Sequence, residues 1–98
     1  MTINKKKNGT SLTLSLEGRL DTITAPDLEA VLKEELDNVE ALTFDLSALD
    51  YISSAGLRVL LSAQKRMNAQ GTMKLTGVGE IIREIFDVTG FSDILTIE

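Results

Sequence analysis

The stretch FDLSALDYISSAGL, residues 44–57, decides the fold because it changes from a strand pattern to a helix pattern within one short segment. Before Ser47 the apolar residues alternate with polar ones, which predicts a strand with one buried face. From Leu57 onward the apolar residues recur at helical spacing, which predicts a helix from about Ser54 to Ala69. The chain therefore passes directly from a central strand into a helix.

Two adjacent serines, Ser53 and Ser54, stand at this junction. A hydroxyl at the start of a helix lies beside backbone N–H groups that have no partner within the helix. The simplest interpretation is that one of the two serines caps the helix. A hydroxyl displayed there also lies at the positive end of the helix dipole, so the position tolerates added negative charge.

The span from Asp45 to Leu57 resembles the signature of bacterial anti-sigma factor antagonists, which belong to the STAS domain family. Two further segments match the family in the same order along the chain, Gly18–Asp21 after an early strand and Arg83–Phe91 at the end of the last helix. The resemblance implies an α/β STAS fold, in which a mixed β-sheet carries about three helices packed mainly on one side.

The resemblance also implies a function as an anti-sigma factor antagonist. Such a protein, when unphosphorylated, binds an anti-sigma factor that is also a serine kinase, and so releases a sigma factor. Phosphorylation at Ser54 would switch this binding off, and a serine phosphatase would restore it. Partner contacts are expected at Asp21, Ser53, Ser54, Ala55 and Gly56. Gly56 is expected to keep a Cβ out of the first helical turn so that the partner approaches closely.

Two alternatives stay open for individual residues. Asp21 follows a strand, where an Asp usually accepts a local N–H in a turn, and this role stands beside the one that the resemblance implies. Ser53 occupies a position at which the family usually has Asp. This difference keeps open a second function, a constitutive STAS interaction subunit of a transporter-associated or signalling assembly without a phosphoswitch.

An enzyme is not expected. An esterase using Ser54 would need a nearby general base, and the chain contains no His. The residues around Ser54 also differ from the Gly-x-Ser-x-Gly turn of hydrolases. With no Cys either, thiol chemistry and cysteine-based metal sites are excluded, and no cofactor or metal is expected.

Length and charge limit the remaining classes. The 98 residues leave room for one small domain, so the resemblance implies a single STAS domain over residues 1–98. A net charge of −5 disfavours direct binding to nucleic acid, because phosphate backbones repel an acidic surface. No apolar run approaches the roughly 20 residues of a membrane span, so the cytoplasm is the expected location.

The remaining patterns predict strand, strand, helix, strand, helix, strand, helix and strand in that order. Helical crossovers join parallel strands, whereas the opening hairpin is antiparallel, so a mixed sheet is expected. Thr24 and Asp27 resemble a capping box at the start of the first helix. Lys5–Lys7 are expected on the solvated shoulder of a turn, and Ile94–Ile97 as a closing strand.

Overall fold

A four-stranded sheet forms the centre of the molecule, which a computed structural model describes over residues 1–98. Its strands lie side by side in chain order: β1 (Thr2–Asn8), β2 (Ser11–Leu20), β3 (Ala41–Ile52) and β4 (Thr72–Thr76). β1 is antiparallel to β2, whereas β2, β3 and β4 are parallel. The expected mixed sheet is confirmed.

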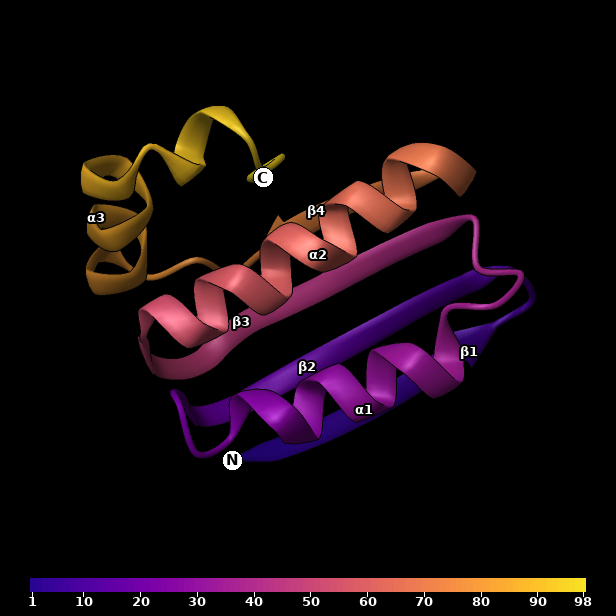
Figure 1. Cartoon of the computed structure of the whole chain (residues 1–98), viewed down its shortest axis with the longest axis horizontal. Helices are drawn as coiled ribbons and strands as arrows, with labels where there is room; N and C mark the ends of the chain where they lie inside the picture. Colours follow the sequence, from indigo (N-terminus) through magenta and orange to yellow (C-terminus); the bar gives the residue numbers. More distant parts are fainter.

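The helices lie mainly on one side of this sheet. Helices α1 (Ala25–Glu35) and α2 (Ser54–Gln70) run side by side across the same face, as Figure 1 shows. Helix α3 (Glu80–Thr89) stands at the end of β3, away from the middle of that face (Figure 1). The predicted arrangement of three helices mainly on one side is therefore confirmed.

The hydrophobic core lies between the sheet and the two long helices. Alternate side chains of the central strands are buried, beginning with Leu12, Leu14 and Leu16 in β2 and Leu42, Phe44 and Leu46 in β3. The helices contribute residues at helical spacing, among them Leu28, Leu32 and Leu36 in α1 and Leu57, Leu60 and Met67 in α2. The opposite face of the sheet is polar and is not covered by a helix.

The strands β2 and β3 are not in simple register near their carboxyl ends. Ser15 pairs with Asp45 and Leu20 pairs with Ile52, so five steps along β2 lie beside seven steps along β3. The additional residues of β3 form bulges, which re-aim side chains and change where a strand ends. As a result the Ser53 N–H donates to the Leu20 carbonyl at 2.9 Å, and the two strands finish together.

The prediction for Lys5–Lys7 is confirmed, because all three lysines are exposed and lie just before the turn at Gly9 and Thr10. These lysines belong to the edge strand β1, where they pair with Leu12–Leu14 of β2. The ammonium group of Lys5 lies 3.0 Å from a carboxylate oxygen of Glu35 in α1. Lysines on an edge strand oppose the addition of a further strand, which accounts for a basic run within a sheet.

The expected closing strand over Ile94–Ile97 is wrong. Gly90, with a φ of 81°, ends α3 in the left-handed region, and a short 3-10 helix follows over Phe91–Asp93. Only Ile97 then reaches β4, where it forms one bridge with Leu75. Two backbone hydrogen bonds of 2.9 Å hold this segment to Leu75, too few for a strand.

Candidate functional site

The expected site residues gather at the edge of the sheet where β2 and β3 end together. Asp21 follows β2, and the two serines Ser53 and Ser54 follow β3. β4 ends earlier, opposite Asp45, and the start of α3 reaches this edge beside Leu49 and Asp50. In Figure 1 the first turns of α1, α2 and α3 all lie at this edge, at the left of the view. Parallel strands bring these segments together although they are far apart in the sequence.

Ser53 caps helix α2. Its backbone is extended, with φ −98° and ψ 176°, and its Oγ accepts a hydrogen bond from the Gly56 N–H at 3.5 Å. The Ser53 carbonyl accepts the Leu57 N–H at 2.9 Å and so begins the helical hydrogen bonds. The side chain is half-buried, and its hydroxyl is occupied within the domain.

Ser54 is the first residue of α2, and it is exposed. Its hydroxyl takes no part in the side-chain hydrogen bonds that order this edge. Ala55 follows it and is half-buried. The two serines therefore differ, because Ser53 serves the helix whereas Ser54 presents a free hydroxyl to solvent.

We expect alanine substitutions to separate these two roles. Ser53→Ala removes the cap and should lower the free energy of unfolding by about 1 kcal/mol. Ser54→Ala removes an exposed hydroxyl that caps nothing, so its unfolding free energy should stay within about 0.5 kcal/mol of wild type. Urea unfolding of both variants measures the difference. A larger loss for Ser54→Ala than for Ser53→Ala would mean that Ser54 is the capping residue.

Asp21 orders the loop between β2 and α1. Its Oδ1 accepts the N–H groups of Ile23 and Thr24 at 3.0 and 3.1 Å, and its Oδ2 lies 3.7 Å from Nε of Arg19. The hydrogen bond from the Thr24 N–H is the main cause that lowers the pKa of the Asp21 carboxyl below its usual range. The predicted turn role of Asp21 is confirmed, and its contact with a partner stays a prediction.

The predicted capping box of Thr24 and Asp27 is wrong. The Thr24 hydroxyl donates to the Arg19 carbonyl at 2.8 Å and accepts the Asp21 N–H at 2.9 Å, so it serves the preceding loop. Thr24 has helical angles, with φ −95° and ψ −19°, and its side chain makes no capping hydrogen bond. Pro26 in the first turn of α1 removes one N–H group that a cap would otherwise have to satisfy.

The role expected for Gly56 needs correction. Gly56 is buried, and a Cβ at this position would lie 2.7 Å from Cγ of Leu20 and 2.9 Å from the Leu20 carbonyl oxygen. Cγ1 of Ile52 would lie 2.8 Å away. The absent side chain therefore makes room for the domain's own strands beneath α2, and a contact of Gly56 with a partner stays a prediction.

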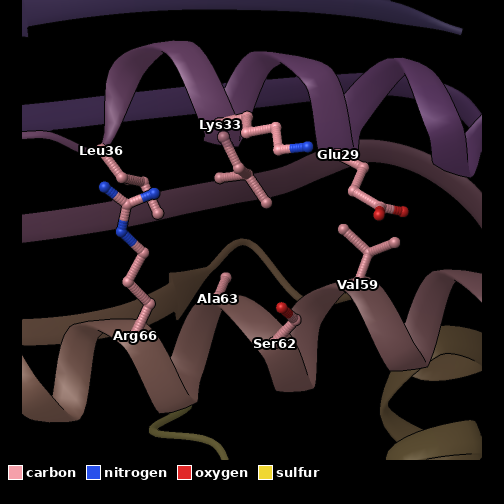
Figure 2. Close-up of a pocket in the computed structure, with 8 residues that line it drawn as sticks. Glu29, Lys33, Leu36, Val59, Ser62, Ala63 and Arg66 are labelled. Carbon is pink, nitrogen blue, oxygen red and sulfur yellow. The ribbon is translucent and has the colours of Figure 1, made fainter.

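A separate groove lies between α1 and α2, and Figure 2 shows its lining. Its volume is about 160 Å³. Leu36, Val59 and Ala63 contribute apolar side chains, while Arg66 is bound through its guanidinium to Asp37 at 2.6 Å. None of the expected site residues lines it, so this groove is a seam between packed helices.

No three His, Cys, Asp or Glu side chains gather closely enough to hold a metal ion. None of the helices combines the length and hydropathy that crossing a bilayer requires.

Comparison with known proteins assigns the chain to a family. The family described as the STAS domain matches residues 2–98, which is nearly the whole chain. The chain belongs to the STAS domain family. The fold expected from the sequence is confirmed by this match.

Two curated relatives carry names that concern sigma factor regulation. BtrV of Bordetella bronchiseptica, provisionally named an anti-sigma factor antagonist, is 39% identical over 84 residues, covering 84% of this chain and 72% of BtrV. The anti-sigma-B factor antagonist of Bacillus subtilis is 29% identical over 96 residues, covering 97% of this chain and 88% of the relative. Antagonists of this kind are regulatory binding proteins.

The solved structures of the anti-sigma factor antagonist SpoIIAA, a Bacillus cell fate determinant, share the fold. Its unphosphorylated form aligns with a TM-score of 0.79 at 16% identity, covering 99% of this chain and 87% of SpoIIAA. Its phosphorylated form aligns with a TM-score of 0.77 at 16% identity, covering 99% and 91%. At this identity the likeness shows the fold.

Two isoleucines at the same edge are exposed against expectation. Ile23 is 85% exposed in the loop that Asp21 orders. Ile81 belongs to an apolar stripe at helical spacing that predicts a buried face, with Ile82, Ile85 and Phe86, but it is 66% exposed in the first turn of α3. Ile23 stands alone between two threonines, outside any strand or helix pattern, and this isolation was the only available signal.

Proposed function

We propose that this STAS domain is an anti-sigma factor antagonist switched by phosphorylation at Ser54. Unphosphorylated, it binds an anti-sigma factor that is also a serine kinase and so releases a sigma factor. Phosphorylated, it dissociates, and a serine phosphatase restores it. The observation that carries the proposal is that the two serines differ in structure. The Ser53 hydroxyl caps α2, whereas the Ser54 hydroxyl is exposed and makes no hydrogen bond within the domain.

The start of α2 suits a phosphorylated serine. A phosphate adds about −1.5 to −2 charges and three acceptor oxygens. At the first position of a helix these oxygens meet unpartnered N–H groups and the positive end of the dipole. The domain should therefore keep its fold when modified, and the consequence should fall on the surface that a partner covers. That SpoIIAA has this fold in both forms agrees with the proposal.

We expect Ser54 to be the phosphoacceptor. Incubation with the cognate anti-sigma kinase and ATP, followed by mass spectrometry, should place one phosphate on Ser54 and none on Ser54→Ala. Ser53→Ala is the matched control, and it should still be phosphorylated because its hydroxyl is only a cap. Phosphate mainly on Ser53 would overturn the assignment of Ser54.

We expect Ser54→Asp to bind the anti-sigma factor at least about tenfold more weakly than Ser54→Ala, which corresponds to ~1.4 kcal/mol. A carboxylate imitates the phosphate in part, with one charge in place of nearly two. Part of the difference should shrink at high salt, because screening weakens charge repulsion but leaves steric exclusion unchanged. Titration calorimetry at two ionic strengths measures both parts.

Equal affinities of Ser54→Asp and Ser54→Ala would place Ser54 outside the contact surface. The constitutive interaction subunit without a phosphoswitch would then be the better explanation. Thermal melts serve as the control here, since both variants should fold as stably as wild type if Ser54 is displayed at a helix end.

A further inference from the structure

Two large apolar side chains are exposed along the edge that carries Ser54. Ile23 lies in the loop after β2 and is 85% exposed, while Ile81 lies just after β4, at the start of α3, and is 66% exposed. Ser54 follows β3, which lies between β2 and β4. The start of α3 borders Leu49 and Asp50 near the end of β3, so the two isoleucines lie toward opposite sides of that strand. Figure 1 shows the corresponding segments, with the loop before α1 and the start of α3 flanking the start of α2. A partner that covers such side chains gains the free energy of burying them.

Ile23 is exposed but its backbone is held. The Asp21 carboxylate accepts the N–H groups of Ile23 and Thr24. The Thr24 hydroxyl accepts the Asp21 N–H and donates to the Arg19 carbonyl, so it links the end of the turn back to its start. A side chain presented from an ordered turn loses less conformational freedom on binding than one on a loose loop. The Asp21 carboxylate therefore fixes the backbone from which the Ile23 side chain projects.

Ile81 borders an open groove of about 350 Å³ between the end of β3 and the start of α3. Leu49 and Ile82 add apolar surface to its lining, and Asp50 and Glu80 add two carboxylates. The lining contains no basic residue. A surface that fits this groove is apolar in its middle and carries Lys or Arg at its border.

We infer that Ile23 and Ile81 are apolar anchors on either side of Ser54, and that Asp21 is a positioning residue for Ile23. The inference rests on the proposed function, because the partner it describes is the anti-sigma factor. That partner should offer two apolar pockets around the site that receives Ser54, with basic side chains beside the pocket for Ile81. A second copy of this chain fits less well, since a two-fold contact would bring Asp50 and Glu80 of both copies into one interface.

Titration calorimetry of the unphosphorylated domain with the anti-sigma factor tests the anchors. Ile23→Ser and Ile81→Ser should each weaken binding at least about tenfold. Val88→Ser is the matched control, because Val88 is 77% exposed but lies at the other end of α3. Its affinity should stay within about twofold of wild type, and all three variants should melt like wild type because the substituted side chains are exposed.

A double-mutant cycle tests the positioning role. Asp21→Ala should weaken binding, whereas Asp21→Asn should retain most of it, because the amide oxygen still accepts the two N–H groups. In the Ile23→Ser background, Asp21→Ala should cause no further loss beyond about twofold. A direct contact between Asp21 and the partner would instead make the two losses multiply.

Several outcomes would overturn the inference and leave the proposed function intact. The inference fails if both isoleucine variants bind the anti-sigma factor with wild-type affinity while Ser54 is still phosphorylated. An equal loss for Val88→Ser would also overturn it, because any exposed apolar residue would then matter. Sedimentation showing a dimer that Ile81→Ser dissociates would assign the groove to a second copy. If wild type neither binds the anti-sigma factor nor is phosphorylated at Ser54, the proposed function and this inference both fail.

Discussion

Gly71→Ala should lower the free energy of unfolding by at least about 3 kcal/mol and the Tm by at least about 12 °C. Gly71 joins α2 to β4, and a Cβ there would lie 1.9 Å from the carbonyl oxygen of Glu40 and 2.6 Å from its carbonyl carbon. This carbonyl cannot simply move aside, because it accepts the Thr72 N–H at 2.9 Å next to the pairing of β3 with β4. Thermal and urea unfolding measure the loss.

Gly79→Ala is the matched control for Gly71→Ala. A Cβ on Gly79 would meet no atom within 4 Å, and its φ of −75° suits any residue. Because Gly79 is the N-cap of α3, where Ala is poorer than Gly, the unfolding free energy of this variant should fall by at most about 1 kcal/mol, well below the loss for Gly71→Ala. An unchanged Tm for Gly71→Ala would contradict this prediction. It would show that the backbone between α2 and β4 can shift away from Glu40 at little cost in free energy.

Gly56→Ala should destabilise the domain by about 2 kcal/mol and weaken partner binding as well. Overpacking of a core typically costs ~1–3 kcal/mol, while an alanine in place of glycine within a helix returns at most ~1 kcal/mol. Here the clash should prevail, because the new Cβ would lie under 3.0 Å from atoms of both Leu20 and Ile52. To relieve it, the first turn of α2 must move away from the strands and carry Ser54 with it.

Two measurements separate the parts of this effect. Urea unfolding gives the stability loss, and calorimetry with the anti-sigma factor gives the binding loss at a temperature where the variant is folded. Ser53→Ala is a suitable comparison, because it also loosens the start of α2 but inserts no atom between helix and strand. Greater stability of Gly56→Ala than of wild type would contradict the close approach of α2 to Leu20.

Much of the fold could be predicted from local patterns. Alternation around Phe44 predicted β3, and helical spacing after Leu57 predicted α2 over nearly its observed length. Such patterns are reliable because the spacing of apolar residues reflects which side chains are buried in the core and which face solvent. In α3 the pattern was less complete: Ile82 and Phe86 are buried, whereas Ile81 lies in water.

The two errors have different physical origins. The side chain of Thr24 had two possible sets of hydrogen-bond partners, and Arg19 and Asp21 in the preceding loop outcompeted the helix. After Gly90 the chain forms a 3-10 helix over Phe91–Asp93, which leaves only Ile97 to pair with β4.

The sequence by itself determined the order of the elements from β1 to α3, the buried faces of β2 and β3, and the serine pair at the start of α2. These depend on neighbours along the chain, whose spacing is fixed by covalent geometry. Only the tertiary structure decided which serine is free, that Gly56 serves internal packing, and that Ile23 and Ile81 are exposed. Each depends on contacts between separate segments. At Gly56 the bulges in β3 align Ile52 with Leu20, and sequence spacing cannot specify how two strands align.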